Sequence, residues 1–262
     1  MFKLWKFTLF FLLCLVVALV INLPVQQVLP YVKLPPSVRL AGIDGSLFSG
    51  SAAEVRINDF PLRGIRYRYM PSCLPMLKLC YHVDYDAGQV ELAYDVLNGD
   101  TEVNRSRVEY PVAVLLAQLP TPALVKPTGR LQLELDELSM LQDKLVTVSG
   151  KLIWRELGLD DASGNVNIGD YQVDFSSDAE GFNFTFSDLD AALDLSGDGS
   201  ISTAGLYEVD VRIATQAGLD SQVKSILNLV AVRSGNSANQ YRIEQKGRLP
   251  ANITRQLLLL RQ

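Results

Sequence analysis

Four aspartates in one short segment are the residues whose type and spacing first suggest chemistry. They are Asp188, Asp190, Asp194 and Asp198. Closely spaced carboxylates could ligate Ca²⁺ or act as a general acid and base. The Ca²⁺-loop pattern with its closing glutamate is missing, however, and the first three aspartates follow a two-residue period, which is typical of one face of a β-strand. We therefore interpret Asp188, Asp190 and Asp194 as groups on the solvent-facing side of one strand.

The sequence contains a single histidine, His82, which leaves little for acid–base or metal chemistry. We interpret it as a structural or surface imidazole beside the cysteine-containing segment. Neither the phosphate-binding pattern Gly-x-x-x-x-Gly-Lys nor the nucleophile elbow Gly-x-Ser-x-Gly occurs. We therefore expect no catalytic residue, no cofactor, no metal and no small-molecule substrate, and we predict that the protein is not an enzyme.

Three cysteines occur, and two of them lie close together. Cys14 belongs to an apolar run and is interpreted as a small apolar residue. Cys73 and Cys80 can close a small loop, and in an oxidising compartment a disulfide is favoured over two buried thiols, which are the alternative. Zinc is not expected, because only His82 could join them and a closed site needs four ligands.

An uncharged apolar run covers residues 7–23. Lys3 and Lys6 precede it, and Lys33 is the next charged residue. A run of this length can cross a bilayer as a helix, because a helix pairs its backbone polar groups within itself. The lysines should keep residues 1–6 in the cytoplasm, so we predict a single-pass anchor with the rest of the chain across the membrane.

A cleaved signal peptide is the alternative, since it also has a basic start and an apolar core. Cleavage needs small residues just before the cut, and residues 20–24 do not offer that pattern. Lipoprotein processing at Cys14 is not expected either, because Leu13 stands where a small residue is needed. We therefore predict that the anchor is retained.

After the anchor, four prolines predict a stiff stalk over residues 24–36 that contains no regular helix. Residues 37–262 are interpreted as one β-rich domain, because apolar and polar residues alternate in short segments between turn residues. These segments are 38–57, 62–69, 82–94, 131–136, 145–154, 166–175, 182–186, 193–195, 207–213 and 241–249. Short helices are expected at 112–119 and 220–232. The predicted fold class is all-β, a mainly antiparallel, curved meander or sandwich-like sheet.

The charge of the chain argues against nucleic acid as a partner, since the net value is −5. Acidic residues gather in the stretch 156–220, which holds fourteen of them and one basic residue, Arg212. We interpret this stretch as a solvated face that resists aggregation. The alternative is a docking surface for a basic partner.

An aromatic row at strand spacing is formed by Phe182, Phe184 and Phe186. Such a row more often belongs to the core of a sheet than to a ligand site. If its apolar face stays open, a lipid- or acyl-chain-binding groove is the alternative function. A membrane-anchored hydrolase is a further alternative, but it needs a cleft of polar groups that this sequence does not supply.

The order of several short motifs resembles the type II secretion system protein N (general secretion pathway protein N) family. The first motif is a glycine-bounded segment made of Gly45, Ser46, Leu47, Phe48, Ser49 and Gly50. It looks like that family's Gly-Thr-hydrophobic-Trp-Ser-Gly motif, with Phe48 in place of Trp. The other matching segments, besides the membrane helix and the helix near 223–230, are 149–154, 197–199, 205–207 and 241–249.

The resemblance implies an accessory, non-enzymatic component of the machinery that exports folded proteins across the outer membrane of Gram-negative bacteria. It places the anchor in the inner membrane and residues 37–262 in the periplasm, with other type II secretion components as partners. Candidate contact surfaces are the bend at residues 45–52 and the acidic stretch 156–220. The family has no agreed active-site residues, so none is assigned.

Overall fold

The computed structural model describes most of the chain and divides it into two compact units, Met1–Val96 and Leu97–Gln262. The described residues are 8–12, 15, 19, 22–31, 38–57, 60–116, 126–141, 144–161, 164–178, 180–215, 223–224, 227–228, 231–233 and 239–249. Each unit is an antiparallel sheet whose strands follow one another as a meander.

Among the described residues, the first unit contains five strands and, after the predicted anchor, three short helical turns. Its elements are α2 (Val25–Val28), η1 (Leu29–Tyr31), β1 (Val38–Gly45), β2 (Ser49–Ile57), β3 (Phe60–Met70), η2 (Pro71–Met76), β4 (Lys78–Tyr85) and β5 (Gly88–Asp95). Each strand pairs antiparallel with the next along the chain. The segments in which apolar and polar residues alternate therefore form a meander, in which every turn joins neighbouring strands.

The two faces of this first sheet bury different pairs of small and branched side chains. Ala52 lies opposite Ile65, and both are buried. Cys80 lies opposite Ala93, and both are buried as well. Because side chains alternate along a strand, Tyr81 points to the face opposite to that of Cys80, where it joins the face of Ile65.

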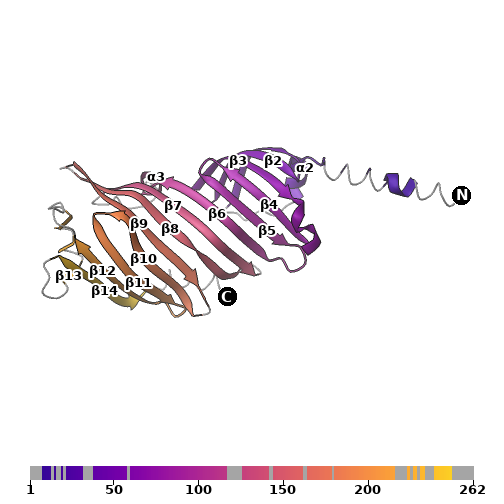
Figure 1. The fold of residues 1–262 in the computed structure, drawn as a ribbon. Coiled ribbons are helices and arrows are strands. Elements are labelled where there is room, and N and C mark those ends of the chain that lie inside the picture. Colours follow the sequence, from indigo (N-terminus) through magenta and orange to yellow (C-terminus); the bar gives the residue numbers. More distant parts are fainter. Residues whose placement is uncertain are drawn as a thin grey trace. The chain divides into compact units, whose positions relative to one another are not determined.

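Among the described residues, the second unit contains nine strands, a short helix and the helical residues 223–224 and 227–228. Its elements are β6 (Thr101–Pro111), α3 (Val112–Leu116), β7 (Lys126–Leu141), β8 (Lys144–Asp161), β9 (Gly164–Ser177), β10 (Gly181–Ala191), β11 (Leu193–Ser202), β12 (Leu206–Thr215), β13 (Val232–Arg233) and β14 (Gln240–Arg248). Strands β6 to β12 lie side by side in chain order, followed by β14 and then β13 (Figure 1).

The core of the second unit lies between one face of the sheet and a helical segment after β12. Residues 223–224 and 227–228 are helical, and the N–H of Ala231 donates to the carbonyl of Leu227 at 2.9 Å. Val223 and Leu227 are only 4% and 5% exposed. The buried residues that form the cluster are Ile168, Leu193, Val211, Ile213, Val223, Leu227 and Tyr241. The three-to-four spacing thus predicted the buried helix face correctly at both of these residues.

The aromatic row on β10 belongs partly to this core. Phe186 packs against the cluster that contains Val223 and Leu227. Phe182 and Phe184 are half-buried. The apolar face is therefore covered at Phe186, where the sequence left both a core and an open groove as alternatives.

Each of the two helices predicted from the sequence can be compared with the structure at one boundary. The helix expected at 112–119 begins at Val112 as predicted, and its end lies outside the described residues. The helix expected at 220–232 ends earlier, because Val232 already belongs to β13. The prediction of an all-β, mainly antiparallel meander with short helices is confirmed, and within each unit the strands form one meander rather than two stacked sheets.

The proline-rich segment after the apolar run is partly helical, so the prediction of a stalk without regular helix is wrong for Val25–Val28 and Leu29–Tyr31. The reason lies in the positions of the prolines. Pro24 precedes the first helical residue, and Pro30 lies within the first turn of the 3-10 helix. A missing N–H costs nothing at such positions, because the first N–H groups of a helix have no partner in it.

The predicted anchor at residues 7–23 is described in part, and the rest of it lies outside the described residues. The described residues of this run are exposed. The helical ones are Thr8, Leu9, Phe10, Phe11, Leu12, Leu15 and Leu19, and the two that are not helical are Asn22 and Leu23. In the described part of the chain, no helix is both long and apolar enough to span a membrane.

Candidate contact site

The glycine-bounded motif forms the turn between β1 and β2. The N–H of Ser46 donates to the carbonyl of Ser49 at 2.8 Å, which closes the turn. The Ser46 hydroxyl accepts from the N–H groups of Phe48 and Ser49 at 3.2 and 3.3 Å. A short hydroxyl side chain at this position thus replaces backbone partners that a tight turn cannot supply.

The outward carbonyls of the turn are bonded by the neighbouring strands. The Tyr67 hydroxyl on β3 donates to the carbonyl of Ser46 at 2.7 Å. The Tyr81 hydroxyl on β4 donates to the carbonyl of Leu47 at 3.3 Å. The N–H of Tyr69 donates to the carbonyl of Phe48 at 2.6 Å. Three consecutive carbonyls are therefore satisfied from outside the turn, which fixes its position on the sheet.

Ring contacts reinforce the same arrangement. Phe48 packs edge-on against Tyr69, with ring centroids 5.1 Å apart and an interplanar angle of 77°. Tyr81 makes edge-on contacts with both Tyr69 and Tyr67, at 5.6 and 6.4 Å. Edge-to-face pairs of this kind each contribute about 0.5–1.5 kcal/mol beyond their burial. We call Tyr67, Tyr69 and Tyr81 the tyrosine clamp.

The Tyr67 and Tyr81 hydroxyls are held in their donating, protonated form. Burial raises the pKa of Tyr67, and the nearby Tyr81 and Asp44 raise it further. Burial also raises the pKa of Tyr81, with a smaller contribution from Tyr69. A raised pKa means that the folded state keeps these protons longer than the unfolded chain. The stability they contribute is thus complete below pH 10 and is lost as the pH rises through the raised values.

Glycine is required at both ends of the turn. Gly45 has a φ of 109°, a conformation that side-chain-bearing residues rarely adopt. A Cβ atom on Gly50 would meet the carbonyl oxygen of Asp44, and the Tyr67 hydroxyl would be only 2.5 Å away. Gly50 therefore leaves the space that the ring of Tyr67 occupies.

The segment that follows the predicted anchor is attached to this turn. Pro24 forms an isolated β-bridge with Ser46. The side-chain amide of Gln26 donates to the carbonyl of Ile43 at 2.8 Å. Pro24 directly follows the apolar run, so the turn lies where the predicted anchor ends.

A loop closed by a disulfide lies at the same end of the strands. Cys73 and Cys80 form a disulfide, with their Cα atoms 6.0 Å apart. Cys80 pairs with Met70 across β3 and β4, so the bridge closes the connection between these two strands. Leu77 ends the 3-10 helix in a left-handed conformation, with a φ of 56°.

His82 lies on the sheet face opposite to that of the clamp. Its Nε2 atom is 3.3 Å from Asp84 Oδ1, and its Nδ1 atom is 3.5 Å from Glu91 Oε1. These are surface ion-pair distances. Within the described residues, no three His, Cys, Asp or Glu side chains come close enough together to hold a metal ion.

Asp188, Asp190 and Asp194 do not lie on one strand, so that prediction is wrong. Asp188 and Asp190 belong to β10, whereas Asp194 and Asp198 belong to β11. A register shift also separates Asp188 from Asp190. The two-residue period was misleading because a single residue, Ala192, joins the two strands and preserves the spacing.

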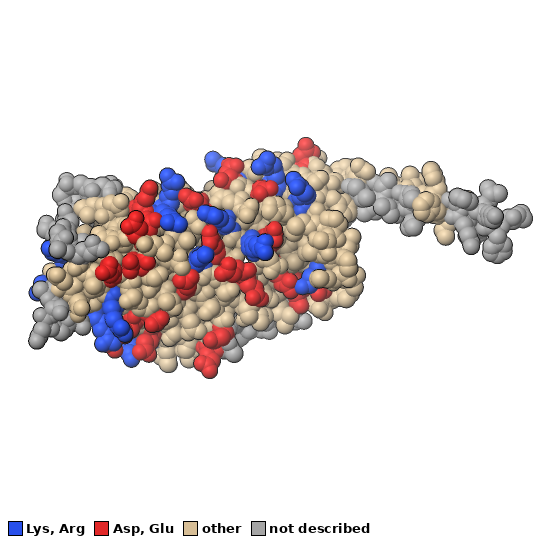
Figure 2. Space-filling view, in the orientation of Figure 1, with Lys and Arg blue, Asp and Glu red and all other residues tan. Residues whose placement is uncertain are grey.

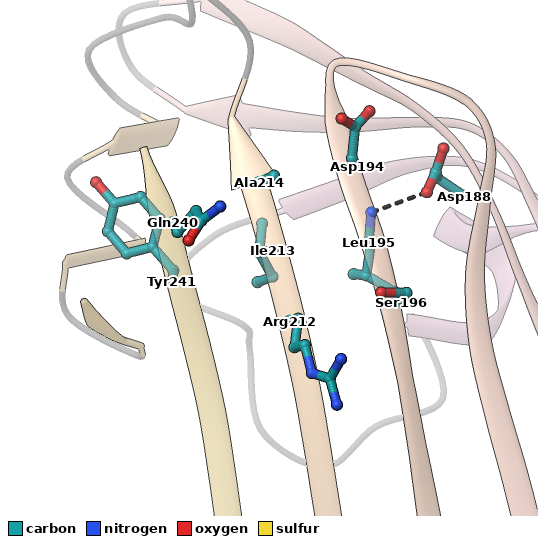
Figure 3. Close-up of a pocket in the computed structure, with 9 residues that line it drawn as sticks. All are labelled: Asp188, Asp194, Leu195, Ser196, Arg212, Ile213, Ala214, Gln240 and Tyr241. Atoms are coloured by element: carbon teal, nitrogen blue, oxygen red, sulfur yellow. Dashed lines mark hydrogen bonds between the residues drawn. The ribbon is translucent and has the colours of Figure 1, made fainter. Parts of the chain in front are cut away.

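Asp188 and Asp194 border a hollow of about 230 Å³ between β10, β11, β12 and β14 (Figure 3). Asp188 accepts a hydrogen bond from the N–H of Leu195 at 2.8 Å, which links β10 to the start of β11. Burial, followed by the charge of Asp188, raises the pKa of Tyr171 to about 12. The observed role of the Asp188 carboxylate is thus to accept a hydrogen bond from the backbone of the next strand.

The acidic stretch 156–220 gains basic partners from strands outside it. Asp170 pairs with Arg155 at 2.9 Å, and Asp210 pairs with Arg242 at 2.7 Å. The hydrogen bonds from Arg242 hold the pKa of the Asp210 carboxyl below its usual value. Figure 2 shows basic side chains interspersed among acidic ones on the side drawn. This pairing favours the interpretation as a solvated face over that as a docking surface.

Glycines in the motifs share a pattern that the sequence analysis missed. Five of them lie directly opposite an aromatic residue on the adjacent strand. The pairs are Gly50 with Tyr67, Gly150 with Phe175, Gly197 with Phe186, Gly199 with Phe184, and Gly247 with Tyr207. For Gly247, a Cβ atom would lie 2.8–2.9 Å from three atoms of the Tyr207 side chain. Because glycine has no side chain, the aromatic ring can lie across the glycine's strand, and this cross-strand contact stabilises the pairing of the two strands.

These features define the class of the protein. It is an antiparallel β-meander whose distinctive residues build a clamped turn and cross-strand glycine–aromatic pairs. Among the described residues that could do chemistry, Asp188 accepts a backbone N–H, and His82 lies beside Asp84 and Glu91.

The comparison with known families gives a more specific result. The family described as type II secretion system (T2SS), protein N matches residues 36–243, so the chain belongs to that family. A relative named type II secretion system protein N, from Vibrio cholerae serotype O1 (strain ATCC 39315 / El Tor Inaba N16961), is 24% identical over 167 residues. The match covers 62% of this chain and 66% of that relative, just under two thirds of its length. No solved structure matches.

The tight fit at Gly50 gives the first prediction. Gly50→Ala places a methyl group against the Asp44 carbonyl and the Tyr67 hydroxyl. We expect the free energy of unfolding to fall by about 1–3 kcal/mol, the usual cost of overpacking. Urea denaturation followed by circular dichroism measures it. Ser51→Ala is the matched control, because the exposed Ser51 is the next residue and points to the other face. Equal stability of the two variants would contradict the clamp.

Proposed function

We propose that this protein is an accessory inner-membrane component of the type II secretion system that acts through protein–protein contacts in the periplasm. The family assignment supports the secretion system as its setting. The observation that carries the contact role is the clamped turn at residues 46–48, whose carbonyls are bonded by three groups of β3 and β4. A turn held in one conformation loses little entropy when a partner binds it.

The inner-membrane location is supported by residues 7–23. Lys3 and Lys6 precede an uncharged stretch of membrane-spanning length. Its described apolar side chains are exposed, and large apolar side chains exposed in a row need an apolar environment. With residues 1–6 in the cytoplasm, the two compact sheets lie in the periplasm.

The disulfide between Cys73 and Cys80 supports the same placement. Disulfides persist in oxidising compartments such as the periplasm and are rare in the cytosol. The bridge closes the loop next to the clamped turn, so it also limits the motion of β3 and β4 where they contact that turn.

We further propose that the protein is not an enzyme and binds no cofactor, small-molecule substrate or nucleic acid. Its net negative charge does not suit a nucleic-acid partner. Asp188, one of the two aspartates at the hollow of Figure 3, accepts a backbone N–H. A lipid groove along the row of Phe182 to Phe186 finds no support at Phe186, which packs in the core with Val223 and Leu227.

The topology predicts how the cysteines react in cells. Thiols are blocked in intact cells with N-ethylmaleimide, and the denatured protein is then treated with a polymer-linked maleimide, with or without prior reduction. We expect Cys73 and Cys80 to gain the polymer only after reduction. In the matched Cys80→Ser variant, Cys73 is blocked by the first reagent. If reduction leads to no polymer addition at these two cysteines, both were free thiols that N-ethylmaleimide had blocked, and this would contradict the placement.

The contact role predicts a position-dependent crosslink. A photoreactive amino acid replaces Ser49, an exposed residue of the motif, in cells that contain the whole secretion machinery. We expect crosslinks to other type II secretion components. The control is the same substitution at Gln89, which is exposed at the opposite end of β5. Crosslinks of equal yield at both positions, or none at Ser49, would count against the clamped turn as a contact surface.

A further inference from the structure

We propose that the disulfide-closed loop at residues 71–77 contacts the membrane, with its apolar side chains entering the interfacial region of the bilayer beside the anchor. This inference rests on the proposed inner-membrane anchor and adds a second, separate contact with the lipid. The contact is made by residues that the structure describes throughout.

The loop holds large apolar side chains in water. Leu74, Met76 and Leu77 are 53%, 71% and 55% exposed. Val96 at the end of β5 is 54% exposed, and its N–H donates to the carbonyl of Leu77 at 3.2 Å. These side chains lie together rather than singly. Clustered exposure of this kind marks a surface that another apolar phase covers.

The loop is built to keep these side chains outward. The disulfide closes it at Cys73 and Cys80. The N–H of Leu77 donates to the carbonyl of Leu74 at 2.9 Å, and the left-handed conformation of Leu77 ends the 3-10 helix. A loop fixed in this way cannot fold its apolar residues back onto the sheet, and it also loses little entropy on binding a surface.

The strand register places the loop at the end of the sheet where the anchor emerges. Pro24 bridges to Ser46 in the clamped turn, one residue after the apolar run ends. Tyr69 bonds the carbonyl of Phe48 in the same turn, and the loop begins two residues later along β3. The pair Ile57 and Phe60 and the turn at residues 86–87 lie at the opposite end. A helix that crosses the bilayer therefore brings the loop to the membrane surface.

The composition of the loop fits a lipid interface. Residues 70–77 contain no acidic residue, and Lys78 follows them. Asp95, the acidic residue opposite Lys78, faces a basic partner on the adjacent strand. Leucine and methionine enter the headgroup–acyl boundary to about 5–10 Å, and tyrosine rings with a polar tip are favoured at that depth. The clamp tyrosines next to the loop have this character.

The test measures depth in the bilayer with the full chain in lipid vesicles. Trp5→Phe removes the tryptophan near the anchor and leaves Trp154 in the second unit. Met76→Trp is added to report on the loop, and Gln89→Trp at the opposite end of β5 is the matched control. We expect vesicles of brominated phosphatidylcholine to reduce the emission of the Met76→Trp variant, relative to unbrominated vesicles. The emission of the Gln89→Trp variant should stay unchanged.

Three results would overturn the inference or the premise on which it rests. Equal emission of the Met76→Trp variant in both lipids, with the chain still held by the vesicles in alkaline carbonate, overturns the loop contact alone. Release of the chain by carbonate overturns the proposed anchor instead. An emission change that occurs only when other secretion components are added means that a protein covers the loop, which also overturns the lipid contact.

Discussion

Three backbone carbonyls at the β1–β2 turn set the geometry on which the first unit depends. A buried carbonyl without a partner costs about 1–3 kcal/mol, and a turn of three residues has no internal donors for all of them. The Tyr67 hydroxyl, the Tyr81 hydroxyl and the Tyr69 N–H supply those donors from β3 and β4. These hydrogen bonds therefore hold the turn, the strands β3 and β4 and the tyrosine rings in one fixed arrangement. The space for it exists only because Gly50 carries no side chain.

The same principle recurs across the second unit. An aromatic ring on one strand lies over a glycine on the next, as for Phe175 with Gly150 and Tyr207 with Gly247. A slip of the pairing by one residue would move each ring to the other face of the sheet and leave the glycine uncovered. These pairs therefore specify the register of a meander whose strands have few large buried side chains. The glycines of these short motifs are therefore explained by the geometry of the sheet rather than by a catalytic role.

Local patterns in the sequence were sufficient for the fold class but not for the site. Period-two alternation predicted the strands, and the spacing of Val223 and Leu227 predicted a helix face that is indeed buried. The clamp could not be predicted, because its hydrogen bonds join residues 21 and 34 positions apart, and only the strand register brings them together. Two predictions were wrong for local reasons. Ala192 continues the two-residue period across a strand boundary, and Pro24 and Pro30 occupy positions where a helical turn accepts proline.

The proposed contact surface requires that the tyrosine clamp fixes the conformation of the turn. The turn's own hydrogen bonds should not be sufficient. The most direct measurement is amide hydrogen exchange at Ser46 and Tyr69, whose N–H groups donate within the turn and from the strand beside it. The parent chain is compared with a Tyr67→Phe variant that lacks only the hydroxyl. Loss of one hydrogen bond of about 1 kcal/mol predicts about fivefold faster exchange at both amides. Unchanged exchange at Ser46 and Tyr69 would show that the turn keeps its conformation without the tyrosine hydroxyl and would contradict the account.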